Sequence, residues 1–324
     1  MHADGQIILM KYRNHSVRKP INHRTASKLL CKLALIVLLL VGLYLYGAHT
    51  RHSGYLAFGV GTPQLKTSAV VHYIDVGQAD AACIVTPDGH TVLIDAGSNS
   101  SQEQLVSYLA KYRIREIDYA IFTHPHEDHI GGADKVFDFC RVRHVILPDA
   151  SASTATYDIL LSSIKEEQCT VEYASPGNTY ALGNALLTIL GPVCAYEDDS
   201  NNASILLRFD FGSTSFLFTG DAEAAAEDAV LQEYKDALNT DVLKAAHHGS
   251  STSSSDAFLS AVTPTLAIIS CGSYNEFGHP HRAVLDRLSS YTPHIFRTDT
   301  HGSIRVYTDG TALLVQSDRK QDDE

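Results

Sequence analysis

The sequence is short of basic residues once its first 32 positions are set aside. The chain has 25 Lys and Arg against 37 Asp and Glu, and residues 1–32 hold seven of the bases but one acid, Asp4. Removing that segment leaves 18 bases and 36 acids in the rest of the chain. Because non-specific binding of nucleic acid depends on basic side chains that displace counterions, this deficit argues against a protein that coats nucleic acid tightly.

Cysteine is also sparse, and it never occurs in the C-x-x-C spacing of zinc ribbons and redox motifs. The six cysteines are spread along the chain as Cys31, Cys83, Cys140, Cys169, Cys194 and Cys271. Cys83 and Cys271 lie in apolar runs, so we expect buried free thiols there. Whether Cys140, Cys169 and Cys194 form disulfides stays open, because pairing depends on geometry.

One long apolar run interrupts an otherwise ordinary globular composition. Residues 33–48 carry no charge, and Leu29 and Leu30 extend the run past Lys32. A membrane-crossing helix needs about 20 residues, a length that is reached if the Lys32 side chain extends to the lipid surface. We predict a transmembrane anchor at residues 29–48 and a basic cytoplasmic tail at residues 1–28, because basic flanks stay inside the cell. The protein would then be a single-pass protein of the cell membrane with its main domain outside.

A cleaved signal peptide is the alternative for this segment. A cleavage site requires small residues, whereas Tyr46 would occupy position −3 of a cut after Ala48. The basic tail is also long for a signal peptide, and we therefore prefer the anchor. Both alternatives place the following domain outside the cytoplasm.

Strands and helices alternate along the rest of the chain, which indicates an α/β fold. We expect a linker at residues 49–68, one domain at residues 69–317 and a polar tail at residues 318–324. Expected strands cover residues 70–74, 81–85, 91–97, 119–122, 142–147, 186–190, 205–209, 215–219 and 266–272, and a closing hairpin turns at Asp309-Gly310. Expected helices cover residues 102–113, 132–139, 157–168, 223–234 and 283–288.

Four potential metal ligands follow the apolar run 119–122, where a buried strand would end. They are His124, His126, Asp128 and His129, followed by the pair Gly131-Gly132, which permits a tight turn. Three imidazoles and one carboxylate within six residues suit Zn²⁺ or a similar ion. A solvated loop that happens to be rich in histidine is the alternative, but clustering at a strand end favours a metal site.

The motif His-x-His-x-Asp-His resembles the signature of the metallo-β-lactamase superfamily. Further stretches resemble the extracytoplasmic hydrolase domain of the ComEC family of DNA-uptake competence proteins, in the order of that family. They are residues 73–80 (YIDVGQAD), 93–97 (LIDAG), 201–204 (NNAS), 216–221 (FLFTGD), 241–250 (DVLKAAHHGS), 277–281 (FGHPH) and 297–302 (RTDTHG). The resemblance implies an αββα sandwich of two mixed sheets, with helices outside and a metal site at one edge. The multi-span channel of full ComEC proteins is missing from this sequence, so DNA import is not implied.

The resemblance also implies a ligand set for two Zn²⁺ ions, with Mn²⁺ as an alternative metal. His124 and His126 would hold one ion, Asp128, His129 and His247 the other, and Asp221 would bridge them. We prefer His247 to its neighbour His248 for the last ligand. Asp95 would support the metal loop from behind, although a strand-end aspartate is also an ordinary turn former.

One departure from the superfamily concerns the first of these ions. Most members have a further histidine before the strand at residues 205–209, where this chain offers Asn201, Asn202 and Ser204. A neutral amide oxygen is a poorer zinc ligand than an imidazole. We therefore expect the site of His124 and His126 to bind its ion more weakly.

Besides Asp128 and Asp221, two residues are candidates for a catalytic role. Lys244 could bind a phosphate, or be a strand-end lysine that extends to solvent. His279 and its neighbour His281 could contact substrate or transfer a proton. The alternative is that both histidines shape the turn before the helix at residues 283–288.

The function predicted on these grounds is hydrolysis by metal-activated water, without a Ser-His-Asp or Cys-His arrangement. The ComEC-like motifs favour phosphodiesters, with single-stranded DNA as one candidate. The acidic composition favours a small ester, a lactone or a β-lactam instead, and the fold accommodates all of these. The missing histidine leaves open a metal-stabilised binding module on the cell surface. No protein partner follows from the sequence.

Overall fold

The computed structural model describes Lys32 and residues 54–59, 67–196 and 199–319. Chain contacts divide the protein at position 51 into the units Met1–Arg51 and His52–Glu324. The predicted cytoplasmic tail and transmembrane anchor lie outside the described residues apart from Lys32. Among the residues that are described, no helix combines the length and the apolar character that crossing a membrane requires.

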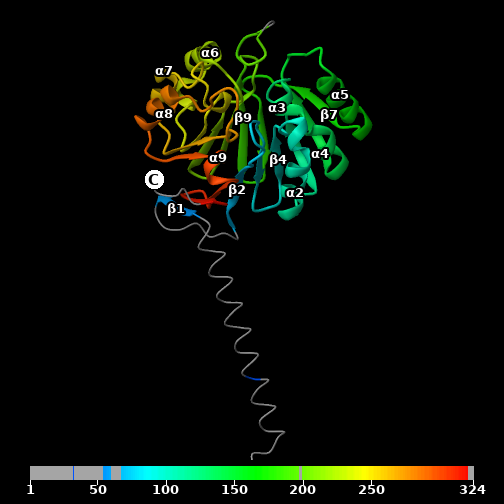
Figure 1. Cartoon of the computed structure of the whole chain (residues 1–324), viewed down its shortest axis with the longest axis horizontal. Helices are drawn as coiled ribbons and strands as arrows, with labels where there is room; N and C mark the ends of the chain where they lie inside the picture. Colours follow the sequence, from blue (N-terminus) through cyan, green and yellow to red (C-terminus); the bar gives the residue numbers. More distant parts are fainter. Residues whose placement is uncertain (1–31, 33–53, 60–66, 197–198, 320–324) are drawn as a thin grey trace, which may run out of the picture. The chain divides into compact units, whose positions relative to one another are not determined.

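Two mixed β-sheets form the centre of the unit that follows Arg51 (Figure 1). The first has the strand order β1-β16-β15-β2-β3-β4-β5-β6-β7 and the second has the order β14-β13-β12-β11-β10-β9-β8. The strands of the first sheet are β1 (Gly54–Gly59), β2 (Ala69–Tyr73), β3 (Ala82–Val85), β4 (Thr91–Ile94), β5 (Glu116–Ile121), β6 (Arg141–Leu147), β7 (Thr170–Tyr173), β15 (Ile304–Thr308) and β16 (Ala312–Ser317). Those of the second are β8 (Thr179–Leu182), β9 (Ala185–Gly191), β10 (Leu206–Phe211), β11 (Thr214–Phe218), β12 (Val242–Lys244), β13 (Leu266–Ile269) and β14 (Ile295–Arg297).

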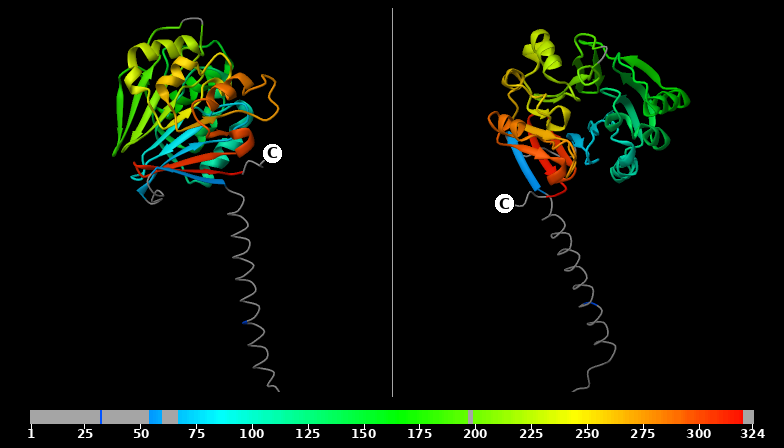
Figure 2. Two further views of the ribbon diagram at one scale, coloured as in Figure 1. Left: turned by 90° about the vertical axis from the view of Figure 1, so that its left-hand side faces the viewer. Right: turned by 45° about the horizontal axis from the view of Figure 1, so that its top comes forward.

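Helices cover the outer face of each sheet, as the two views of Figure 2 also show. On the first sheet lie α2 (Gln102–Lys111), α4 (Ala133–Phe139) and α5 (Ala155–Glu167), and on the second α6 (Ala224–Tyr234), α7 (Asp256–Val262) and α8 (Arg282–Ser289). In α2 the buried residues Leu105, Tyr108 and Leu109 recur at the spacing of one helix face. This four-layer arrangement confirms the predicted αββα sandwich.

Three hydrophobic clusters hold the layers together. The central one joins the inner faces of the two sheets through residues such as Tyr73, Phe209 and Phe218, all nearly inaccessible to solvent. The other two lie between each sheet and its helices. Because each fully buried large apolar side chain contributes roughly 1.5–3 kcal/mol, the sandwich does not depend on the polar groups at its edge.

The parallel part of each sheet positions the polar edge. Strands β4 to β7 run parallel in the first sheet, and β11 to β14 run parallel in the second. Carboxyl ends of parallel strands meet at one edge of a sheet, and ligands bind there in open α/β sheets. The loops after β4, β5, β11 and β12 therefore converge on one region.

Some elements differ from the sequence prediction. Residues 54–59, which we expected in the linker, form β1 and pair antiparallel with β16. Gly54 and Gly59 thus stand at the ends of a strand and not inside a flexible connection. The metal loop contains a short helix, α3 (Glu127–Ile130), while β7, β8, β14 and α7 had no clear sequence signal. The five cysteines among the described residues are free, and Cys83 and Cys271 are buried as predicted.

Candidate metal centre

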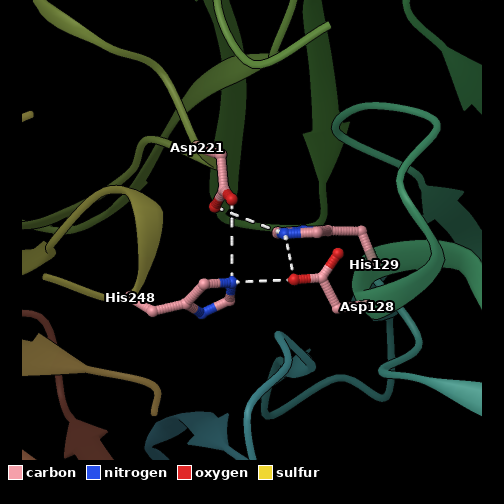
Figure 3. A group of neighbouring side chains, drawn as sticks. All are labelled: Asp128, His129, Asp221 and His248. Atoms are coloured by element: carbon pink, nitrogen blue, oxygen red, sulfur yellow. Dashed lines mark hydrogen bonds and ion pairs between the residues drawn. The ribbon is translucent and has the colours of Figure 1, made fainter. Parts of the chain in front are cut away.

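Four side chains from three separate loops meet where the two sheets open at this edge (Figure 3). They are Asp128, His129, Asp221 and His248, whose ligand atoms all lie within 4.8 Å of one another. Nε2 of His248 lies 3.2 Å from Oδ2 of Asp128 and 3.6 Å from Oδ2 of Asp221. Nε2 of His129 lies 3.3 Å from Oδ1 of Asp221.

The position of each residue in the group follows from the strand or helix that precedes it. Asp128 and His129 lie on α3, just after the end of β5, and Asp221 follows β11. His248 lies on a short 3-10 helix, η4 (His247–Gly249), that follows β12. The parallel parts of the two sheets thus direct their strand ends to a common point, which is how the fold assembles ligands that are far apart in sequence.

The buried atoms of this group fit a bound cation. Nε2 of His129 and Oδ1 of Asp221 are buried and form no hydrogen bond to any described residue. Most buried polar atoms in folded proteins are hydrogen-bonded, because leaving them unpaired costs free energy. Two imidazoles and two carboxylates form a donor set that suits Zn²⁺ or a similar divalent ion.

The charges of the group also favour the binding of a cation among these four side chains. Burial opposes ionisation of Asp221, but the imidazoles of His129 and His248 hold the pKa of its carboxyl well below the usual range. Burial likewise opposes a charge on His129, yet the Asp221 and Asp95 carboxylates raise the pKa of that imidazole well above its ordinary value. A divalent ion that binds here would displace these protons, so its affinity increases with pH.

Asp95 supports the metal loop from behind, as the sequence predicted. One of its oxygens accepts from the backbone N–H of Thr123 at 2.7 Å, and the other accepts from Nδ1 of His129 at 2.8 Å. The same oxygen accepts from the hydroxyl of Thr123 at 2.8 Å. Asp95 thereby fixes the ring orientation of His129 and leaves Nε2 as its ligand atom, an arrangement common around metal-ligating histidines.

Lys244 does not have the position expected for a residue that binds phosphate. Its side chain is buried at the carboxyl end of β12, in the middle of the second sheet, and its ammonium donates to Oδ2 of Asp80. Asp80 forms a second acidic group with Asp95 and His129. Lys244 supplies the cation of that second group, so we assign it a structural role beneath the metal centre.

His124 and His126 lie beside the four-residue group. Nε2 of His124 is 3.9 Å from Oδ2 of Asp221 and 3.0 Å from Nδ1 of His126. Nδ1 of His124 lies within hydrogen-bonding distance of the hydroxyls of Thr123 and Ser204, at 3.2 and 3.3 Å. Burial and the neighbouring His129 lower the pKa of His124 well below its usual value, which keeps the ring neutral, as ligation requires.

The sequence preference for His247 over His248 differs from what the structure assembles. His248 is the buried member of the four-residue group, and its Nδ1 lies 3.0 Å from the carbonyl oxygen of Ser270. His247 is partly exposed, with Nε2 at 3.7 Å from Oδ2 of Asp221. Adjacent histidines after a strand give no sequence signal that separates them, because the turn conformation decides how deeply each one is buried.

His279 lies close to the centre, whereas His281 belongs to the turn. The ring of His279 is 5.6 Å from the ring of His247 and 6.3 Å from that of His248. His281 accepts from the backbone N–H of Ser251 at 2.9 Å, and its Nε2 lies 3.2 Å from the carbonyl oxygen of Phe277. These contacts hold the His281 ring in place and agree with the turn-shaping alternative for that residue.

Sequence reasoning missed two carboxylates at this site. Asp80 pairs with Lys244, and Glu223 places Oε1 at 3.2 Å from Nδ1 of His247. Asp80 ends the YIDVGQAD stretch, so its place in that motif was an available signal. Glu223 is a lone acid before α6 and carries no such signal.

The four-layer fold and a His/Asp group at its strand ends define a class, the metal-dependent hydrolases built on an αββα sandwich. The sequence model of the metallo-β-lactamase superfamily matches residues 74–159, a range that includes β4, β5 and the histidine-rich loop. This chain therefore has a domain that belongs to the metallo-β-lactamase superfamily of hydrolases.

Its relatives include competence proteins. ComE operon protein 3 of Bacillus subtilis is 30% identical over 260 residues, covering 75% of this chain and 33% of that protein. Competence protein ComA of Neisseria gonorrhoeae is 27% identical over 241 residues, covering 74% of this chain and 32% of that protein. The chain spans about a third of the length of these curated relatives.

A solved structure agrees with the fold. The metallo-β-lactamase fold protein YhfI from Bacillus subtilis superposes with a TM-score of 0.50 at 13% identity. The match covers 74% of this chain and 99% of that protein. Because identity is this low, the likeness bears on the fold alone.

Proposed function

We propose that this protein is a membrane-anchored, extracytoplasmic hydrolase that uses divalent metal ions to cleave phosphodiesters, with single-stranded DNA as a candidate substrate. The observation that carries the proposal is the group Asp128, His129, Asp221 and His248, assembled at an open strand edge. When bound by these residues, a divalent ion would act as a Lewis acid that lowers the pKa of its bound water and stabilises negative charge on a phosphoryl oxygen. The similarity to competence proteins supports a nucleic-acid substrate.

His279 is suited to contact the substrate at the rim. Burial, His248 and His247 lower its pKa to about 4, so the ring is neutral at pH 7. Oε1 of Gln78 accepts from the backbone N–H of Gly272 at 3.0 Å, which turns the Gln78 amide N–H₂ toward Nδ1 of His279 at 3.4 Å. With Nδ1 accepting, the proton of the neutral ring is on Nε2, and this N–H is the donor we assign to a phosphoryl oxygen.

Exposed aromatic rings in the segment just before His279 favour a substrate that carries bases. Tyr274 is fully exposed, and Phe277 is exposed and stacks on His279 with ring centroids 5.6 Å apart. Bases of single strands stack on such rings at roughly 1–3 kcal/mol per base, whatever their sequence. The acidic composition opposes tight binding, so we expect transient engagement of the strand.

The assay that tests this function uses the full-length chain in detergent, loaded with Zn²⁺ or Mn²⁺. It compares a single-stranded oligonucleotide, bis(p-nitrophenyl) phosphate and nitrocefin. Hydrolysis of the first two supports the proposal. Cleavage of nitrocefin alone would assign the protein to small cyclic amides or esters, and metal binding without any hydrolysis would favour a binding module.

The aromatic contribution has its own test. Replacing Tyr274 and Phe277 together by Ser is expected to raise KM for the oligonucleotide about tenfold, the equivalent of one stacked base. Tyr173→Ser is the matched control, because Tyr173 is also exposed but lies on β7 at the far edge of the first sheet. An equal effect of both substitutions would count against stacking at the rim.

Membrane attachment is tested separately from activity. We expect protease added to intact cells to remove the domain and to leave residues 1–28 protected, since basic flanks stay in the cytoplasm. A reporter fused after Glu324 that functions only in the cytoplasm would overturn this topology.

A further inference from the structure

We infer that His247 is a metal ligand in its own right and completes a first metal site with His124, His126 and Asp221. The second site then consists of Asp128, His129, His248 and the shared Asp221. This inference rests on the proposed use of metal ions by the centre. It replaces the expectation that the first site is short of a ligand.

The orientation of the His247 ring is that of a ligand. Its Nδ1 lies 3.2 Å from Oε1 of Glu223 and 3.3 Å from the hydroxyl of Thr252, which leaves Nε2 directed at Asp221. A histidine that binds metal through one nitrogen commonly donates its other N–H to a carboxylate. Glu223 is in place for this role, and the side-chain amide of Asn201 donates to its Oε1 at 3.4 Å.

Three other histidines of the centre share this pattern. In each, Nδ1 contacts a protein oxygen: that of Asp95 for His129, of Ser270 for His248, and of Thr123 and Ser204 for His124. In each, Nε2 lies within 4 Å of an Asp221 oxygen, at 3.3, 3.6 and 3.9 Å. His247 matches both features, with 3.7 Å to Oδ2 of Asp221.

The backbone explains how two adjacent imidazoles reach the same carboxylate. His247 and His248 both have left-handed backbone, with φ of 51° and 53°, and Gly249 follows at 83°. Left-handed backbone costs a non-glycine residue roughly 1–2 kcal/mol. This turn brings Nε2 of both rings within 4 Å of Asp221.

Of the two asparagines at the position of the missing histidine, Asn202 is already engaged in hydrogen bonds. Oδ1 of Asn202 accepts from the backbone N–H groups of Glu223 and Ala226, and its Nδ2 donates to Asp199. Asn202 therefore caps α6 and has no free oxygen for a metal. Oδ1 of Asn201 is buried without a hydrogen-bond partner among the described residues, so Asn201 is the rival ligand that an experiment must separate from His247.

The experiment measures metal binding in the absence of substrate. The full-length chain is titrated with Zn²⁺ against a competing chelator, and Co²⁺-loaded protein is examined by electron paramagnetic resonance. We expect two ions per chain in the wild type, and a magnetically coupled Co²⁺ pair. The variant His247→Asn is chosen because asparagine tolerates left-handed backbone. In this variant we expect one tightly bound ion, a second ion whose affinity is about ten- to a hundredfold lower, and no magnetic coupling.

Control variants make the outcome specific. Glu223→Gln is expected to weaken the same ion by about ten- to a hundredfold through loss of orientation. Asn201→Ala and His281→Asn should keep both ions, and the ion retained by His247→Asn shows that this variant is folded. Two tight ions in His247→Asn, one ion in the wild type, or loss of an ion in Asn201→Ala would overturn the inference. Two bound ions without phosphodiester hydrolysis would instead refute the proposed function and leave this inference standing.

Discussion

The two halves of the metal centre are built in different ways. The first half is the loop after β5, where His124, His126, Asp128 and His129 lie within six residues and Asp95 fixes the loop from behind. The second half is Asp221 on the loop after β11 and the adjacent His247 and His248 on the loop after β12. Both histidines have left-handed backbone. A ligand set that is dense in sequence can be held by local hydrogen bonds, whereas a scattered one needs turn strain and neighbouring carboxylates to direct it.

The most damaging test of this comparison removes the residue on which both halves converge. Asp221 lies within 4 Å of four imidazoles, so Asp221→Ala is expected to lose both ions and on the order of 10³-fold in kcat/KM, about 4 kcal/mol. Metal content and hydrolysis are measured together. The fold should persist because its clusters are apolar, and a variant that kept metal and most of its activity would contradict the assignment.

A smaller effect is expected from loosening the first half alone. Asp95→Asn weakens the acceptor of the His129 N–H, so we expect metal affinity or activity to fall about ten- to a hundredfold. Isothermal titration with Zn²⁺ measures it. If the second half keeps its geometry without Asp95, the affinity for only one ion should fall. An equal fall in affinity for both ions would show that Asp95 orders the whole centre.

The turn that carries His247 and His248 can be strained by a substitution at Gly249, which is not itself a ligand. A Cβ at Gly249 would lie 2.5 Å from Cβ of Pro280, in addition to the cost of its φ of 83°. We expect Gly249→Ala to lower the free energy of unfolding by about 2 kcal/mol, measured by thermal denaturation. Gly89→Ala is the control, since φ is 94° there but nothing lies within 4 Å. Equal losses would mean that backbone strain alone, and not the packing against Pro280, limits this turn.

The smallest effect concerns acid stability outside the metal centre, at His72 on β2. Burial, with a further contribution from Arg305, lowers the pKa of His72 to about 3. The unfolded chain therefore binds the proton first, and stability is lost as pH falls from about 6.5 toward 3. At pH 5.5 we expect a loss of about 1.4 kcal/mol relative to pH 7.5, which His72→Phe removes. Denaturant titrations of the metal-free protein at both pH values test this, and an unchanged pH slope in the variant would refute it.

Sequence reasoning succeeded where the signal is local and failed where the tertiary path decides. The histidine-rich loop, the Asp95 support and the alternation of strands and helices were readable because periodicity and short spacing encode them. The burial of Lys244 could not be read from its motif, because the motif does not show that β12 lies inside a sheet, where the side chain turns inward to Asp80. Strand β1 was missed because pairing with β16 joins segments about 260 positions apart.

The convergence of both sheets on one centre has a consequence for the order of folding. Asp128 and His248, whose side chains lie 3.2 Å apart, are separated by 120 positions. Such non-local contacts form late, because a long loop must close before they contribute stability. The complete ion site cannot exist on the nascent chain until β12 has joined its sheet. If the centre binds ions as proposed, their uptake follows the folding of the domain, and the bound ions would then stabilise the contact between the two halves of the centre.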